Sequence, residues 1–542
     1  MNSTFYIFET MEAIVCSKRI TRFVLAFLFI FYGSSSYSQL TVNGYVYQDN
    51  NGNDKKDRRE NGVARVAVSN GEDVVLTDAK GFYSLSVSDG QTIFVIKPEG
   101  FRFPLDSFYL PRFYYHYRPQ GSPDFFRYKG IAPTGRLPKQ LNFPVIKYDE
   151  PREFSAVIFG DPQPYSIADL DAFSKKIVAD VKKRPNTIFG ISLGDIVGNH
   201  LDLQPVYKER MRPLQLTWYN VMGNHDMNFD ATTDELSDET FQKNFGLANY
   251  SFNHGDAHFI ILDDILYPDP RDGKSYWAGY RDDQFKFLEN NLKLVPKNKL
   301  IVISQHIQMK DTTGNGFRQK DKRRLFALLK DYENVVALSA HTHFQEQLYY
   351  TEKQGWNGAK PLHEYNVGTT SGDWYSGLQD ENGMPDGTMR DGTPQGYAFL
   401  NISGNQYNFD YKVAGKPDDY QMTIFAPKVV PRKGRTTSQI FVNFFMGSKD
   451  DVVEYRVGNG DWKKMDYTEK IDPSFNLKLV EWDLTERLLP GRRPSAAVNS
   501  SHLWSGNIPL NLPVGEHAIE VRATDRYGKV HFGKRTYKIL ER

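Results

Sequence analysis

The chain has 542 residues, which is more than one hydrophobic core usually organises, so about three or four structural units are expected. Its 40% hydrophobic and 25% charged residues are typical of a soluble globular protein. The 67 basic and 66 acidic residues nearly cancel, and they balance once the segment before Gln39 is removed. A general affinity for nucleic acid or for anionic membranes is therefore not indicated.

Residues 1–38 are predicted to be a signal peptide. Basic residues precede an unbroken apolar run at 23–32, and Ser36 and Ser38 place small side chains where a signal peptidase cleaves. The run is shorter than the roughly 20 residues that a bilayer span needs, so no permanent membrane span is expected. Cleavage near Ser38 would export the protein to the periplasm, the cell surface or the medium; an uncleaved anchor is the alternative. The single cysteine, Cys16, would be lost, which excludes disulfides.

Residues 40–147 alternate short apolar runs with Gly and Asn-Gly breaks. This texture predicts a small N-terminal β-sandwich. The part after Phe101 is rich in Pro, Tyr and Phe without clear periodicity, and it is interpreted as a connector.

A polar loop in this first region matches the spacing of a calcium-binding loop. Positions one, three, five, nine and twelve of such a loop correspond to Asp49, Asn51, Asn53, Asp57 and Glu60. Lys55 would offer its carbonyl at position seven, but position six is Asp54 where calcium loops have Gly. A calcium site is thus one hypothesis, and a solvated polar loop is the other.

Residues 151–414 alternate predicted strands and helices, which indicates a layered α/β domain. Apolar runs at 156–159 and 301–303 are typical of buried strands, and the stretches 167–183, 282–294 and 320–331 are amphipathic. The strand texture returns in residues 420–542, where 517–523 alternates clearly. This C-terminal β-rich domain, like the N-terminal one, is interpreted as a scaffold or interaction module.

Five polar clusters in the α/β region each follow an apolar run. They are Gly160-Asp161-Pro162-Gln163, Leu193-Gly194-Asp195, Met222-Gly223-Asn224-His225-Asp226, Ser304-Gln305-His306 and Ser339-Ala340-His341-Thr342-His343. Open α/β sheets bind ligands at the carboxyl ends of their strands, so the five clusters are expected to converge. Each cluster alone is compatible with a turn or a helix cap; their order and placement carry the argument.

This ordered set resembles the calcineurin-like metallophosphoesterases, whose pattern is Asp-x-His, Gly-Asp, Gly-Asn-His-Asp/Glu, a lone His and Gly-His-x-His. The match covers about half of the chain. The resemblance implies a central β-sandwich flanked by helices, in four layers, within an exported three-part subtype that carries N- and C-terminal β domains.

The resemblance also implies roles for individual residues. One metal would be held by Asp161, Gln163 and His343, the other by Asn224, His306 and His341, with Asp195 bridging the two. His225 would face the leaving group as general acid, and Asp226 would orient His225.

Two metal ions beside only two carboxylates would leave the site positively charged, which suits a phosphate. The implied reaction is hydrolysis of a phosphate mono- or diester by a hydroxide that bridges the two ions. The substrate would be a phosphorylated small molecule, lipid or glycan. An envelope- or glycan-binding protein with a degenerate site is the alternative, and a purely structural β-rich protein is a third reading.

Two residues depart from the family pattern. Gln163 replaces a His, and its amide oxygen is expected to favour Mn or Fe over Zn. Ala340 replaces the Gly of Gly-His-x-His.

Three further residues are candidate substrate contacts. His200 would reach the second metal or cap a turn, and Trp374 would stack on a sugar or base or pack in the core. Arg390 would bind an anion or form a structural salt bridge.

Overall fold

The computed structural model describes residues 40–181, 184, 186–310 and 316–541. The predicted signal peptide lies outside the described residues. The chain from Gln39 onward forms one compact unit. None of the described helices is both long and apolar enough to cross a bilayer.

Two four-stranded sheets form the N-terminal region. Their orders are β4-β1-β8-β6 and β3-β2-β5-β7. The strands are β1 (Leu40–Gln48), β2 (Ala67–Ser69), β3 (Val74–Leu76), β4 (Phe82–Val87), β5 (Thr92–Val95), β6 (Phe101–Arg102), β7 (Tyr114–His116) and β8 (Phe143–Lys147). Alternate residues such as Val42, Val46 and Val68 are fully buried in one shared core, which confirms the small β-sandwich.

The segment after Phe101 is more than a connector, because β6, β7 and β8 lie in it. Val46 of β1 pairs with Phe143 of β8 in parallel register. Prolines and aromatic residues interrupt the alternation along this segment, so its sequence does not show the period of two that marks a strand.

Two mixed sheets form the centre of the molecule. The five-stranded sheet has the order β11-β10-β9-β21-β22, and the six-stranded sheet has the order β12-β13-β16-β17-β19-β18. The first contains β9 (Glu153–Phe159), β10 (Thr187–Leu193), β11 (Thr217–Val221), β21 (Gly396–Ser403) and β22 (Gln406–Val413). The second contains β12 (Tyr250–His254), β13 (Ala257–Ile261), β16 (Leu300–Ser304), β17 (Asn334–Ser339), β18 (Glu346–Tyr350) and β19 (Leu362–Asn366).

The two sheets pack face to face. Ile158 of β9 and Val302 of β16 share the inner core, and Tyr219 of β11 stacks on Phe252 of β12 with ring centroids 4.0 Å apart. The next residue along each strand points the other way, so Phe159 and Ile303 lie in the outer core with the helices. Successive side chains of a strand point to opposite faces, and both sets are buried here because both faces of each sheet are covered.

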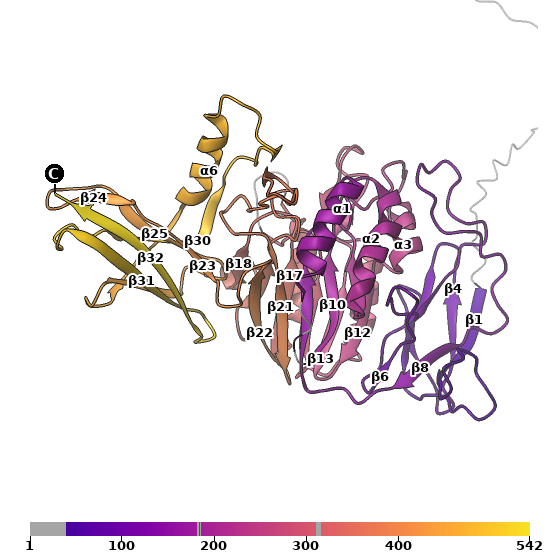
Figure 1. Cartoon of the computed structure of the whole chain (residues 1–542). Helices are drawn as coiled ribbons and strands as arrows, with labels where there is room; N and C mark the ends of the chain where they lie inside the picture. The colour runs from indigo at the N-terminus through magenta and orange to yellow at the C-terminus, as the bar shows by residue number, and fades with distance from the viewer. Residues whose placement is uncertain (1–39, 182–183, 185, 311–315, 542) are drawn as a thin grey trace, which may run out of the picture. The chain divides into compact units, whose positions relative to one another are not determined.

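Helices cover the outer faces and complete the predicted four layers. They are α1 (Ile167–Phe173), α2 (Gln204–Met211), α3 (Glu239–Phe245), α4 (Asp282–Leu292) and α5 (Gln319–Leu329). Of these, α1, α2 and α3 are labelled in Figure 1. The helices expected at 282–294 and 320–331 match α4 and α5 closely. The one expected at 167–183 is shorter, because α1 ends at Phe173 and gives way to a π-helical turn at Ser174–Val178.

The C-terminal region has two sheets around a separate core that includes Ile440, Trp504 and Ile519. Their orders are β23-β25-β30-β28 and β24-β32-β31-β26-β27. The strands are β23 (Met422–Phe425), β24 (Val429–Pro431), β25 (Gln439–Phe444), β26 (Val452–Val457), β27 (Lys463–Lys464), β28 (Asp466–Ile471), β30 (Asn499–Asn507), β31 (Gly515–Thr524) and β32 (Val530–Leu540). The alternating run at 517–523 lies in β31.

Three short pieces complete the fold. The helix α6 (Pro473–Asp483) starts at Asp472, whose side chain accepts a hydrogen bond from Phe475 N. The pair β14 (Ile265–Leu266) and β15 (Trp277–Ala278) is local, whereas β20 (Gly377–Leu378) pairs with β29 (Gly491–Arg492) and so joins the C-terminal region to the loop after β19. The domain boundaries given above stay predictions.

Candidate metal centre

The five polar clusters meet at one edge of the two central sheets. Each follows the carboxyl end of a strand that pairs in parallel with at least one neighbour. Asp161 and Gln163 follow β9, Asp195 follows β10, Asn224 and His225 follow β11, His306 follows β16, and His341 and His343 follow β17. The structure therefore brings together all seven residues predicted to bind metal.

Asp195 lies at the middle of this group. Its Oδ2 is 3.3 Å from His306 Nε2 and 3.0 Å from Gln163 Nε2. His306 Nε2 is in turn 3.2 Å from Asn224 Oδ1 and 3.2 Å from His341 Nδ1. Ligand atoms of Asp195, His306 and His341 all lie within 4.8 Å of one another, and they are the one group of three or more His, Cys, Asp or Glu in the described chain that does so.

Asp161 and His343 form the other half of the group, with Asp161 Oδ2 3.3 Å from His343 Nε2. The backbone fixes the ring orientation on both sides, because His343 Nδ1 lies 2.7 Å from Gly372 O and His306 Nδ1 lies 2.8 Å from Leu193 O. An outer hydrogen bond of this kind leaves the Nε2 atom of each ring facing the site, as in metal-ligating histidines.

Three buried polar atoms in the group make no hydrogen bond within the described protein. They are Asp161 Oδ2, Gln163 Oε1 and His343 Nε2, and their residues are no more than 1% exposed. Asp161 Oδ2 and His343 Nε2 face each other at 3.3 Å without forming a hydrogen bond. A buried polar atom left without a partner costs about 1–3 kcal/mol. Two oxygens and one imidazole nitrogen are suitable donors for a divalent or trivalent metal ion, so these residues fit the predicted metal.

The charges of the group also favour a bound cation. Burial acts to raise the pKa of Asp195, but His306 and His225 hold it below its usual range, so the carboxylate stays ionised. Burial acts to lower the pKa of His306, yet Asp195 and Asp161 raise it to about 10. Positive charge is therefore stabilised at His306 Nε2, and a metal ion that binds there displaces the proton.

The backbone is strained at five of the seven predicted ligands. Their φ angles are positive: 30° at Asp161, 37° at Gln163, 47° at Asp195, 70° at His341 and 56° at His343. Non-glycine residues in this region cost of order 1 kcal/mol or more each and persist where the surroundings enforce them. Strain concentrated on the ligands indicates a functional site.

Glycines make room for the ligands. A Cβ on Gly223 would lie 2.1 Å from Asp195 N and 2.3 Å from Asp195 Oδ1, and one on Gly194 would lie 2.5 Å from His306 Nδ1. Ala340, which replaces the family's Gly, is fully buried beside Gly160. Its methyl group is accommodated because Gly160 has no side chain.

His225 lies beside the ligands and is held by a residue that sequence reasoning missed. Its Nδ1 is 2.6 Å from Asn199 Oδ1, and its backbone N donates to Asp195 Oδ1 at 2.8 Å. Asn199 stands four residues after Asp195 with a φ of 64°, and no motif marks it. Asn199 directly precedes His200, and nothing in the sequence around it indicates the contact with His225.

Asp226 does not have the role predicted for it. Its Oδ2 accepts hydrogen bonds from Ile196 N at 2.9 Å and from Gly223 N at 3.0 Å, and its Oδ1 accepts one from Val197 N at 3.2 Å. Both carboxylate oxygens of Asp226 thus accept hydrogen bonds from backbone N–H groups and none from the His225 ring. Asp226 ties the Gly-Asp loop to the Gly-Asn-His-Asp turn.

The three candidate substrate contacts fall in different places. Trp374 stacks on His343 with ring centroids 3.9 Å apart and an interplanar angle of 24°, so it supports a predicted ligand. Arg390 Nε donates to Ala496 O at 3.1 Å, so Arg390 contacts the backbone of the C-terminal region in place of the expected salt bridge. His200 is exposed and directly precedes the short 3₁₀ turn Leu201–Leu203, but its side chain makes no capping hydrogen bond to that turn.

The N-terminal polar loop is closed by hydrogen bonds among its own residues. Asp49 Oδ1 accepts from Gly52 N at 2.7 Å, and Asp57 Oδ2 accepts from Asn51 Nδ2 at 2.8 Å and from Asn53 Nδ2 at 3.0 Å. Glu60 accepts from Asn50 N at 3.0 Å and from Asp57 N at 2.9 Å. Asp54 has a φ of 59°, the conformation for which calcium loops use Gly.

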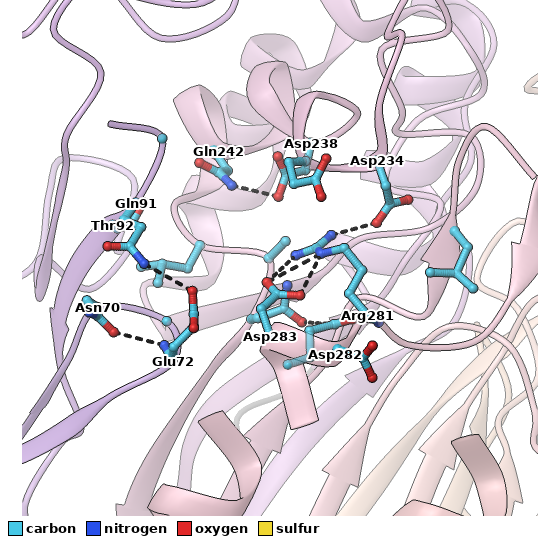
Figure 2. A pocket seen from close by; sticks show the side chains of 18 of the residues that line it. Asn70, Glu72, Gln91, Thr92, Asp234, Asp238, Gln242, Arg281, Asp282 and Asp283 are labelled. Carbon is cyan, nitrogen blue, oxygen red and sulfur yellow. Dashed lines mark hydrogen bonds and ion pairs between the residues drawn. The ribbon is translucent and has the colours of Figure 1, made fainter. Parts of the chain in front are cut away.

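A separate cavity of about 680 Å³ lies where the N-terminal sheets meet the central region. Figure 2 shows Arg281 within it, beside Asp234 and Asp283. Arg281 Nη1 lies 2.7 Å from Asp234 Oδ2, and Arg281 Nε lies 3.1 Å from Asp283 Oδ1. Burial raises the pKa of Asp238, another lining residue, to about 7. None of the residues that line the cavity is a predicted metal ligand, so catalysis is assigned to the metal centre.

The comparisons with known proteins agree with this geometry. Family models match three consecutive parts of the chain: the N terminal of calcineurin-like phosphoesterase at 49–130, calcineurin-like phosphoesterase at 154–345, and the C terminal of calcineurin-like phosphoesterase at 364–531. The chain belongs to the calcineurin-like phosphoesterases of this three-part type. It is accordingly a metal-dependent hydrolase of phosphoester bonds with a dinuclear metal centre.

Two solved structures are distantly similar. A purple acid phosphatase from yellow lupin (Lupinus luteus) seeds is 12% identical, with 69% of this chain and 67% of that chain covered and a TM-score of 0.34. The Plasmodium protein GAP50, described as the anchor in the inner membrane complex, is 15% identical, with 49% and 85% covered and a TM-score of 0.31. Both scores are too low to carry an argument. A search of curated proteins found no match.

Proposed function

We propose that the protein is an exported phosphoesterase in which His225 donates the proton to the leaving oxygen. The observation that carries this proposal is the convergence of unpartnered ligand atoms at Asp161, Gln163 and His343 next to an imidazole of fixed orientation. The metal pair would supply positive charge and Lewis acidity for the phosphate.

His225 is set up to exchange a proton at one atom only. With Nδ1–H donating to Asn199 Oδ1, the proton that moves is the one on Nε2. His225 Nε2 is 3.9 Å from Asp195 Oδ2 and the side chain is 26% exposed, so it borders both the metal centre and the solvent through which a substrate enters. This position suits a general acid that faces the leaving group.

The decisive assay uses metal-reconstituted protein and compares a phosphomonoester with a phosphodiester. Asp195→Asn is expected to lose metal and activity together. His225→Ala is expected to keep its metal while kcat falls by about 10²–10⁴-fold. Asp461→Asn and His517→Ala, which alter the same residue types in the C-terminal region, serve as controls. Unchanged turnover in His225→Ala would refute the assigned role, and absence of turnover in the wild type would favour the glycan-binding alternative.

The metal preference rests on Gln163. An amide oxygen in place of an imidazole nitrogen favours Mn or Fe over Zn. Competition between Zn and Mn, followed by metal analysis, is expected to show higher Zn retention in Gln163→His than in the wild type. An identical Zn to Mn ratio in the two proteins would remove Gln163 from the explanation.

Export is supported by the sequence of residues 1–38. Mass spectrometry of the protein recovered from an exporting host is expected to find a mature N-terminus at Gln39. Leu25→Arg, which breaks the apolar run, is expected to prevent this cleavage. Recovery of uncleaved wild-type protein in the membrane fraction would favour the anchor. Phosphorylated small molecules, lipids and glycans are the substrate classes that fit an exported enzyme; calcium in the N-terminal loop stays a prediction.

A further inference from the structure

The C-terminal region brings an arginine to the rim of the metal centre. Arg492 lies in β29 and pairs with Gly377 of β20. Its Nη2 donates to Asp373 O at 3.2 Å and to Trp374 O. Ser495 N also donates to Asp373 Oδ2 at 2.6 Å. The segment around Arg492 thus fixes the loop that carries Trp374.

One aromatic side chain connects Arg492 to a predicted metal ligand. Arg492 binds the carbonyl of Trp374, and the ring of Trp374 stacks on His343 with centroids 3.9 Å apart.

Arg492 differs from its neighbour in how its charge is used. Arg493 forms two hydrogen bonds with Asp483, at 2.5 and 2.6 Å. Within the described parts of the chain, the side chain of Arg492 donates to carbonyl groups, and no carboxylate forms an ion pair with it. An exposed guanidinium without a carboxylate partner binds phosphate or carboxylate groups well, because its planar donors match two oxygens at once.

We propose that Arg492 forms a subsite for a second anionic group of the substrate, a phosphate or carboxylate carried by the leaving group. The inference rests on the proposed function, since it takes the scissile phosphate to bind at the metal pair and His225 to face the leaving group. Arg492 binds the carbonyl of Trp374, whose ring stacks on His343, so the subsite lies beside the metal centre. The C-terminal region then helps to select the substrate.

The experiment compares propyl phosphate with propane-1,3-diyl bisphosphate, which differ by one phosphate on a flexible leaving group. Metal-loaded wild type is expected to show about tenfold higher kcat/KM for the bisphosphate, the effect of one charge-assisted hydrogen bond. Arg492→Gln keeps a donor for the Trp374 carbonyl but has no charge, and it is expected to reduce the preference to about onefold. Arg492→Lys is expected to retain part of it.

Arg493→Ala is the matched control and is expected to keep the full preference. If Arg492→Gln merely loosened the Trp374 loop, kcat/KM would fall equally for both esters and their ratio would remain, which would overturn the proposal. Equal hydrolysis of both esters by the wild type would also overturn it while leaving the proposed function intact. Hydrolysis of neither ester would count against the proposed function itself.

Discussion

The molecule contains two clusters of oxygen- and nitrogen-bearing side chains with metal-ligand spacing, and they differ in how their polar atoms are satisfied. In the central site, Asp161 Oδ2, Gln163 Oε1 and His343 Nε2 are buried without a hydrogen-bond partner. In the N-terminal loop, the carboxylates of Asp49 and Glu60 accept hydrogen bonds from the loop's own backbone. The first cluster needs an ion to satisfy its ligands, whereas the second is already closed.

The comparison predicts that one added methyl group reduces metal binding and turnover strongly at the central site and has little effect in the N-terminal loop. Gly223→Ala would place a methyl group against Asp195 N and Oδ1, and something must shift. We expect metal to be lost and kcat/KM to fall by more than about 100-fold, the upper range for loss of an outer-shell partner. Metal analysis and turnover of an aryl phosphate measure both effects.

Gly52→Ala is the matched change in the N-terminal loop. Gly52 has a φ of 71°, and a Cβ added to it would meet nothing within 4 Å. Only the conformational cost of about 1 kcal/mol is expected, with no change in turnover. Similar losses of activity in the two variants would show that the contrast between the clusters is false.

The next largest effect is expected when a side chain that packs against a predicted metal ligand is removed. Trp374→Ala removes the ring that stacks on His343, and metal affinity is expected to fall by about 10–100-fold. Trp374→Phe should restore most of the affinity. Trp462, whose ring lies 4.7 Å from Arg456 in the C-terminal region, is the control, and Trp462→Ala should leave metal affinity unchanged. Metal retention on dialysis distinguishes these outcomes.

Much of the central site could be predicted from sequence because the ligands follow apolar strands in a fixed order. That order alone predicts that Asp195 and His306 lie close together. The role of Asn199 could not be predicted, since it depends on a left-handed turn that brings its amide to His225. The contact predicted for Asp226 was wrong because the direction of its side chain depends on how the turn folds.

The flanking regions were harder to predict in detail. Period-two patterns located strands such as β1 and β31, but β8 was missed because prolines and aromatics obscure its alternation. The pairing of β20 with β29 joins residues more than a hundred positions apart, and no local pattern encodes it. Contacts of this kind place Arg492 at the rim, where sequence alone gave no reason to look.

Removal of the Asn199 side chain is expected to give a smaller effect, which is confined to kcat. Asn199→Gly removes the acceptor for His225 Nδ1 without strain at a position with a φ of 64°. We expect kcat to fall by about tenfold, part of the effect of a general acid, while the metal content stays constant. Asn199→Asp retains an acceptor and should recover most of kcat. Loss of metal in Asn199→Gly would contradict the separation between proton donor and metal ligands.

The smallest expected effect concerns calcium in the N-terminal loop. Extracellular calcium modules bind with Kd near 10⁻⁴–10⁻³ M, so 10 mM Ca²⁺ would add about 1–3 kcal/mol to the free energy of unfolding of this part. The gain is small because the loop is already closed by hydrogen bonds to Asp49 and Glu60. The measurement is Tm of metal-loaded protein with and without calcium. Glu60→Gln should abolish the shift, and Glu72→Gln, outside the loop, should keep it. An unshifted wild-type Tm would favour a polar loop that binds no calcium. The central site would then be the cluster that requires an ion, and the N-terminal loop the one that does not.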